Sequence, residues 1–339
     1  MVRRVLSWAL GAVVLTLLVM TTWPQAFQLH RLPVAAQLVA FRGTVLVLAA
    51  VLFLVVLILA LSSTRSPRLA GLMLIGLLAV VLSNGLVLFQ RGTQSAAAAS
   101  GNGIVMLSWN VLRDSVPVDT VAGLVRREGA QVVALQEISH EHAEAITDAI
   151  QSGGDASWQL FTLPNPASDD AAGTALLISS GLGEYRLTDA FGGTRVNASI
   201  VAEPTVTLIN RPMFIAVHAA APMPWLMSDW DGDLRWLASM CNDYPAVLLG
   251  DFNATIDHFS GLQTGSNKDA VLGSCVDAAG TARSAAHGTW PTLLPSLLGS
   301  PIDHIMATKD WRIDGYEVIQ DHDNAGSDHR PIVASLHLQ

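Results

Sequence analysis

Side chains that can bind a metal ion or transfer a proton recur at the ends of short apolar runs in the C-terminal two thirds of the chain. Asparagine and the carboxylates supply oxygen ligands, and histidine exchanges a proton near neutral pH. One such residue alone is more often a turn former or a structural group. Together they predict a site, because sheet enzymes place their sites at strand ends. The set is Asn110, Glu137, His218, Asp251, Asn253, Asp303, Asp328 and His329.

The spacing of the aspartates indicates which side chains share a face. Asp251 and Asn253 are two positions apart, so an extended backbone would point both to the same side. Asp303 begins an apolar run, and His304 directly follows it. His304 would therefore point to the opposite face, where a structural role is the more common one for histidine.

Three of these residues predict a site for a hard divalent cation. Asn110, Glu137 and Asp328 offer only oxygen ligands, which suit Mg²⁺ or Mn²⁺. Zinc would favour histidine or cysteine, and the chain has two cysteines and no Cys-x-x-Cys motif. Such cations keep several waters and bind phosphate oxygens.

The elements that must position these residues have an α/β pattern. Short apolar runs flanked by turn residues predict strands, and amphipathic stretches between them predict helices. Asp229 and Asp231 are candidate N-caps for the last helix. The predicted strands are 104–110, 132–137, 174–179, 214–219, 246–253, 302–307 and 331–338, and the predicted helices are 118–128, 140–151 and 229–242.

Seven short elements, in order, resemble the endonuclease/exonuclease/phosphatase superfamily, which includes secreted DNases, apurinic-site endonucleases, sphingomyelinases and inositol-polyphosphate phosphatases. The elements are SWN (108–110), LQE (135–137), VHAAAP (217–222), LLGDFNA (248–254), GTWP (288–291), PIDHIM (301–306) and GSDHRPI (326–332). The resemblance covers 102–339. It implies a four-layer α/β sandwich, with two mixed sheets face to face and helices outside. It also implies metal-dependent cleavage of a P–O bond.

The resemblance implies a role for each catalytic candidate. His329 would take a proton from the attacking water, and Asp303 would accept a hydrogen bond from its other ring nitrogen. Asp251 and Asn253 would orient the water and a phosphate oxygen. His218 would donate to the phosphate or to the leaving group. In some family members a second carboxylate supports this histidine, and the sequence shows no counterpart.

The GTWP element adds two candidates for substrate binding. Thr289 and Trp290 belong to a segment that lies near the site in family members. A role in shaping the site is expected of them rather than a role in catalysis.

The first hundred residues predict a membrane anchor. Residues 1–101 contain no Asp or Glu, and three uncharged stretches, at about 5–23, 43–64 and 69–90, are long enough to cross a bilayer. A cleaved signal peptide is the alternative for the first stretch. The predicted organisation is an anchor over 1–91, a flexible linker over 92–102 and a catalytic domain over 103–339. Asn84 is expected to form a contact between anchor helices.

The arginines predict the orientation of this anchor. The positive-inside rule places arginine-rich segments next to membrane spans in the cytoplasm. Here these segments contain Arg3 and Arg4, before the first span, and Arg65 and Arg68, between the second and third. The N-terminus is then cytoplasmic, and the catalytic domain lies outside the cell membrane. Two cysteines in that oxidising environment, Cys241 and Cys275, either form a disulfide or remain two separate buried thiols.

Charge bears on the substrate. Residues 102–339 hold all 28 acidic residues and 12 of the 19 basic ones, a net charge of −16. Since polyanion binding draws on clustered lysine and arginine, a lipid or cell-envelope phosphoester is favoured over nucleic acid. A surface-anchored Mg²⁺-dependent nuclease remains the main alternative, and a non-catalytic receptor or scaffold the third. The excess of arginine over lysine, with abundant alanine, is typical of a GC-rich bacterial genome.

Overall fold

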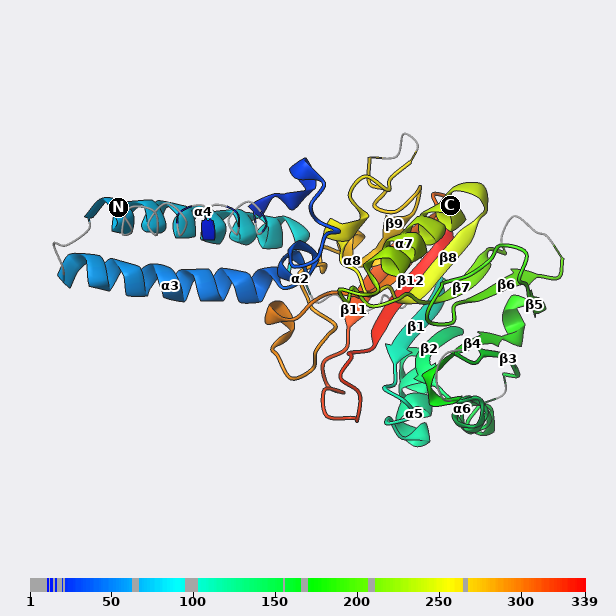
Figure 1. Cartoon of the computed structure of the whole chain (residues 1–339). Coiled ribbons are helices and arrows are strands. Elements are labelled where there is room, and N and C mark those ends of the chain that lie inside the picture. Colours follow the sequence, from blue (N-terminus) through cyan, green and yellow to red (C-terminus); the bar gives the residue numbers. More distant parts are fainter. Residues whose placement is uncertain are drawn as a thin grey trace.

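The computed structural model describes residues 22–62, 67–94, 103–154, 156–165, 170–206, 211–264 and 268–339, and five single residues between 11 and 20. Two long helices, α3 (Arg42–Ser62) and α4 (Pro67–Arg91), lie side by side and extend away from an α/β body (Figure 1). Both are long and apolar enough to cross a membrane. The predicted span at 5–23 lies mostly outside the described residues, so the structure describes two candidate spans rather than three.

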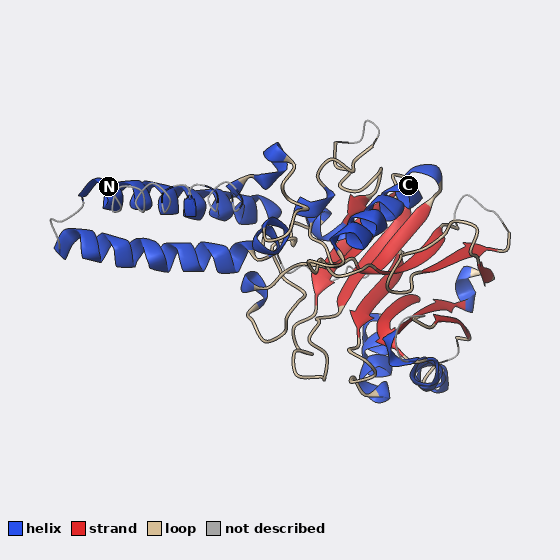
Figure 2. Cartoon of the chain, in the orientation of Figure 1, coloured by secondary structure: helices blue, strands red, loops and turns tan. Residues whose placement is uncertain are grey.

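The α/β body contains two six-stranded sheets, both mixed (Figure 2). One has the order β11-β12-β1-β2-β4-β3, with β1 and β2 parallel. The other has the order β5-β6-β7-β8-β10-β9, with β7 and β8 parallel. The strands are β1 (Ile104–Asn110), β2 (Val132–Ile138), β3 (Trp158–Leu163), β4 (Gly173–Ser179), β5 (Tyr185–Leu187), β6 (Ile200–Pro204), β7 (Met213–His218), β8 (Ala246–Asp251), β9 (Val276–Asp277), β10 (Asp303–Ala307), β11 (Trp311–Val318) and β12 (Ile332–Leu338).

Helices cover the outer faces of the sheets. The helices α5 (Val118–Glu128) and α6 (His140–Ser152) pack on the first sheet, and α7 (Met227–Asp243) packs on the second. A separate apolar core fills the space between the sheets. This arrangement confirms the expected four layers. The short elements are α2 (Ala35–Ala40), α8 (Ala278–Thr281), η1 (Pro24–Phe27), η2 (Asp170–Ala172), η3 (Ser180–Leu182), η4 (Ile256–Phe259) and η5 (Ser296–Leu298).

The predicted strands and helices are all present, with one correction to a helix start. The helix α7 begins at Met227, and its N-cap, Leu226, forms no side-chain cap bond, so neither Asp229 nor Asp231 is the N-cap. Asp231 pairs instead with Arg235 one turn later. The strands that sequence patterns missed, β3, β5, β6, β9 and β11, are short or carry polar residues, so their apolar runs are interrupted.

The two long apolar helices are joined to the α/β body by a buried ion cluster. Asp257 in η4 accepts hydrogen bonds from Nε of Arg42 at 2.8 Å and from Nη2 of Arg91 at 2.5 Å. Arg42 begins α3, and Arg91 ends α4. Arg42 also donates to Asn84 at 2.9 Å, so Asn84 forms the expected contact between anchor helices. Both helices are therefore fixed to the same loop of the body.

The start of the predicted linker also contacts the body. Gln94 N donates to Arg283 O, and Ala286 N donates to Gly92 O. Residues 92–94 therefore pair with the segment after α8 instead of forming a free tether. Residues 95–102 of the predicted linker lie outside the described residues.

The cysteines form a disulfide, Cys241–Cys275, with Cα atoms 5.4 Å apart. The bond joins the C-terminal half of α7 to the segment just before β9. Of the two alternatives left open by the sequence, the structure has the disulfide.

Candidate active site

Three of the predicted residues meet across neighbouring strands because of the strand register. The strand β7 runs parallel to β8, which pairs His218 with Asp251. The strand β10 runs antiparallel to β8, so its first residue, Asp303, also pairs with Asp251. Adjacent strands are about 4.8 Å apart. The end of β7, the end of β8 and the start of β10 thus bring three buried polar side chains together.

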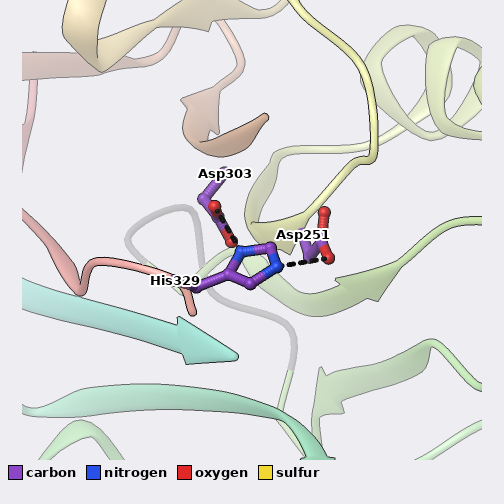
Figure 3. Close-up of side chains that lie close together, drawn as sticks. All are labelled: Asp251, Asp303 and His329. Carbon is purple, nitrogen blue, oxygen red and sulfur yellow. Dashed lines mark hydrogen bonds and ion pairs between the residues drawn. The ribbon is translucent and has the colours of Figure 1, made fainter. Parts of the chain in front are cut away.

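His329 reaches this group from the loop before β12 (Figure 3). Its Nδ1 donates to Oδ2 of Asp303 at 2.9 Å, and its Nε2 lies 3.9 Å from Oδ2 of Asp251. Burial disfavours a charged ring, but the carboxylates of Asp303 and Asp251 outweigh this effect and raise the pKa of His329. The ring is thus oriented by Asp303, as the family resemblance implied, and its other nitrogen faces Asp251.

Other motif residues hold the His329 loop in place. The indole Nε1 of Trp109 in β1 donates to the backbone carbonyl of His329 at 2.8 Å. The hydroxyl of Ser327 donates to Asn110 O and accepts from His329 N. Arg330 is buried and pairs with Asp323 at 2.6 Å. The conformation of this loop therefore depends on both sheets.

Asn110 and Glu137 approach from the first sheet. Nδ2 of Asn110 donates to Oε1 of Glu137 at 3.0 Å and to Oδ2 of Asp251 at 3.3 Å. Glu137 has a φ of 53°, at an irregularity in the pairing of β2 with β4. A positive φ at a non-glycine residue is uncommon and often marks a functional constraint. Through its hydrogen bonds to Glu137 in the first sheet and Asp251 in the second, Asn110 connects the two sheets at the site.

Asn253 reaches the site by a route that differs from the predicted one. The strand β8 ends at Asp251, and Asn253 has a φ of 48°, so the extended-strand argument for this residue is wrong. Its side chain still donates to Ala219 O at 3.0 Å, and its backbone N–H donates to Oδ1 of Asp251 at 2.8 Å. A tight turn after the strand, and not strand alternation, places it beside Asp251.

Asp251 and His218 have shifted acidities. Burial and the neighbouring carboxylate of Asp303 raise the pKa of Asp251. Burial and the nearby His329 lower the pKa of His218 to about 3. His218 is therefore neutral at physiological pH, and its Nδ1 has no hydrogen-bond partner among the described residues.

The GTWP segment has two different functions. Trp290 donates from Nε1 to Oδ2 of Asp328 at 2.8 Å, so it orients a candidate metal ligand. Thr289 is fully buried, and its hydroxyl accepts from the backbone N–H groups of Ile302 and Asp303. Thr289 is not among the residues that line the cavity, and its side chain fixes the start of β10 from inside the fold.

Most of the candidate site residues line a cavity of about 610 Å³. His218, Asp251, Asn253, Asp328 and His329 form part of its wall. Asn110 and Asp303 are not among the lining residues and support those that are. His304 lies elsewhere, as expected, with its ring between Asp277 and Ala254 O. The lining also contains Arg113, Asn165, Asn197 and Phe41, which the sequence analysis did not identify.

Arg113 is the one lysine or arginine among the described residues that line the cavity. It lies in a run of three residues with positive φ, Leu112 to Asp114, directly after β1. Arg113 follows Asn110 by only three positions, so its place in the sequence indicates that it lies near the site. Its approach to the cavity depends on that unusual turn, which no pattern of apolar residues indicates.

Two groups of side chains have donor atoms suited to a metal ion. The ligand atoms of Asp251, Asp303 and His329 lie within 4.8 Å of one another. Most of them already pair within the group or with Asn110 and Asn253. The second group is the predicted oxygen set, in which Oδ1 of Asp328 has no hydrogen-bond partner among the described residues and lies 4.0 Å from Nε2 of His329. That orphaned oxygen and the all-oxygen donors fit a hard divalent cation.

The chain is similar to known proteins in sequence and in fold. Residues 107–329, about two thirds of the chain, match the model of the Endonuclease/Exonuclease/phosphatase family. No match is found among curated proteins. A structure of an endonuclease/exonuclease/phosphatase from Beutenbergia cavernae is 16% identical, with a TM-score of 0.52 over 69% of this chain and 71% of that one.

Two structures of D. rerio TDP2 are also similar. A form humanized by 14 mutations is 17% identical, with a TM-score of 0.52, and a complex with a single-strand DNA product is 16% identical, with a TM-score of 0.50. Each covers 70% of this chain and 100% of the TDP2 chain. At this identity the structures establish the shared fold, and the family follows from the sequence match. The chain belongs to the endonuclease/exonuclease/phosphatase family, whose members are hydrolases that act on phosphoester bonds.

Proposed function

We propose that this protein is a membrane-anchored, metal-dependent phosphoesterase that hydrolyses a lipid or cell-envelope phosphoester outside the cytoplasm. One observation carries the chemistry: His329 lies between Asp303 and Asp251 at the wall of a cavity that also holds oxygen ligands. Asp303 holds the ring through Nδ1, so Nε2 is the nitrogen that can accept a proton from water. A base for water requires that orientation.

The residues act on water and phosphate as follows. Asp251 and Asn253 hold the attacking water, whose oxygen forms a bond to phosphorus while its proton passes to Nε2 of His329. Asp303 stabilises the imidazolium that results. The P–O ester bond breaks, and neutral His218 donates a hydrogen bond to the phosphate or to the leaving oxygen. The leaving oxygen takes a proton from solvent, and His329 returns its proton to solvent.

Asn110, Glu137 and Asp328 are the proposed ligands of Mg²⁺ or Mn²⁺. When bound, the cation would neutralise charge on the phosphate and, by repulsion, lower the raised pKa of His329. The imidazole could then be neutral, as a base must be, closer to neutral pH. Asn110 would bind through Oδ1, which also accepts from Leu112 N at 3.0 Å, since its Nδ2 donates to Glu137 and Asp251.

The substrate class rests on charge and on position. Residues 102–339 carry a net charge of −16, which disfavours binding to a polyanion. The ion cluster of Arg42, Arg91 and Asp257 fixes the body directly against two helices suited to a bilayer. A site held there would meet lipid head groups at high local concentration.

A parallel assay tests this function. We expect the full-length protein in detergent with Mg²⁺ to hydrolyse phosphoesters of the lipid or envelope class in a panel of sphingomyelin, phosphatidylinositol, phosphorylated sugars, DNA and RNA. EDTA should abolish the rate, and added Mg²⁺ should restore it, because the phosphate charge then lacks its counter-ion. Faster cleavage of DNA or RNA than of every lipid and sugar would favour the nuclease alternative.

The metal ligands are checked in the same assay. Glu137→Gln should raise the Mg²⁺ concentration for half-maximal rate by at least about 10-fold, since an amide replaces a charged ligand. The exposed Glu144→Gln is the matched control and should leave the metal dependence unchanged. An unchanged Mg²⁺ requirement in Glu137→Gln would move the metal site to the Asp251, Asp303 and His329 group.

The proposed location rests on the arginines and the disulfide. In the sequence, Arg65 and Arg68 lie between the two candidate spans, Arg42–Ser62 and Leu69–Arg91, a position that the positive-inside rule assigns to the cytoplasm. The Cys241–Cys275 bond favours an oxidising compartment for the body. We expect a periplasm-active reporter fused after Gln339 to be active and a cytoplasm-active reporter to be silent. The reverse pattern would place the body inside the cell.

A further inference from the structure

Residues of the membrane anchor form part of the wall of the active-site cavity. The helix α2 leads into α3, and Phe41 is the residue between them. Gln37, Ala40 and Phe41 line the same cavity as His218 and His329. The α/β body alone would therefore have an incomplete cavity.

This part of the wall is held in place from both sides. Nε2 of Gln37 donates to the carbonyl of Pro222, the last residue of the VHAAAP element. The ring of His258 contacts Ala36 O at 3.1 Å through Nε2. One residue beyond Phe41, Arg42 is fixed to Asp257. The wall thus has a defined position relative to the catalytic side chains.

The wall is apolar where it faces the site. The ring of Phe41 is half-buried, and its centroid lies 5.7 Å from that of Trp290, which orients Asp328. Ala40, Pro222 and Met223 extend this surface, and Met223 is 46% exposed. A phosphoester placed against the carboxylates and histidines would leave one substituent facing this apolar surface.

We propose that residues 37–41 determine specificity by selecting phosphoesters that carry an apolar group next to the phosphate. This inference rests on the proposed phosphoester hydrolysis and names the substrate class: an amphiphile, bound with its phosphate at His329 and its apolar part at Phe41. The wall continues directly into α3, so such a substrate has a short path from a bilayer surface to the site.

A matched pair of substrates tests the inference in the full-length protein with Mg²⁺. Methyl and butyl p-nitrophenyl phosphate share the same leaving group and differ by three methylenes, and each buried methylene strengthens binding by about fourfold. We expect kcat/KM to be at least about 10-fold higher for the butyl ester. Phe41→Ala should lower this ratio to about 1–3, and Phe41→Leu should retain most of it. The control is Phe27→Ala, at an exposed residue of η1 that is not in the cavity wall. This substitution should leave the ratio unchanged.

A binding measurement separates this inference from the proposed function. Calorimetry with butyl phosphate and methyl phosphate requires no turnover, and the same preference and the same loss in Phe41→Ala are expected. If neither ester is hydrolysed but this binding pattern holds, the proposed function fails and the assignment of the wall stands. Equal kcat/KM for both esters in the wild type, or equal loss of preference in Phe27→Ala, would overturn the assignment.

Discussion

Replacing His329 with alanine should lower kcat for phosphoester hydrolysis by about 10²- to 10⁴-fold, because the substitution removes the group that takes the proton from the attacking water. The imidazole is held by Asp303 at 2.9 Å and faces Asp251 at 3.9 Å. Because the carboxylates raise its pKa, the neutral ring becomes more abundant as the pH rises. The wild-type rate should therefore increase from neutral toward alkaline pH, and the His329→Ala rate should lose that dependence.

The control for this substitution is a histidine outside the cavity. His140 is exposed on α6, and His140→Ala should retain the wild-type rate and pH profile. Thermal unfolding of both variants shows whether the fold is kept. A folded His329→Ala protein that retains more than a tenth of the wild-type kcat would contradict the role of this residue as base.

Replacing Asp257 with asparagine should destabilise the protein by about 3–5 kcal/mol, because Arg42 and Arg91 then lose their buried counter-charge. The expected fall in Tm is roughly 6–20 °C for a body of this size. Burial alone would raise the pKa of Asp257, but Arg91 and Arg42 outweigh it and hold this pKa well below its ordinary range. The stabilisation is thus complete above about pH 3.9, the unfolded value, and is lost as the pH falls toward the folded pKa.

An exposed ion pair provides the comparison. Arg186 and Glu203 pair on the surface of the second sheet, and Glu203→Gln should cost no more than about 1 kcal/mol. Thermal unfolding of the full-length variants in detergent at neutral pH measures both effects. Similar Tm values for Asp257→Asn and Glu203→Gln would show that the buried cluster does not hold the anchor to the body.

Much of the fold follows from local patterns in the sequence. The run IVMLSWN becomes β1 with the predicted ends, and 118–128 becomes α5. Central strands buried on both faces are apolar along their whole length, which makes them easy to identify. Edge strands such as β3 are half-buried, so their composition is mixed and the apolar signal is weak.

The candidate site residues could be identified from the sequence, because asparagine, carboxylates and histidines at strand ends form a recognisable set. Their geometry was decided by tertiary structure. Asn253 depends on a turn with positive φ, and Thr289 faces inward to hold Asp303. Conformations of this kind are stabilised by neighbours that are distant in sequence, and so they leave no local pattern.

The relation of the anchor to the site was decided by tertiary structure alone. The sequence predicted three apolar spans, because a bilayer requires length and low charge, and two of them are helices among the described residues. It does not indicate that Arg42 and Arg91 share Asp257, or that Phe41 reaches the cavity. Those contacts join residues more than 160 positions apart, and only the packing of the two parts against each other brings them together.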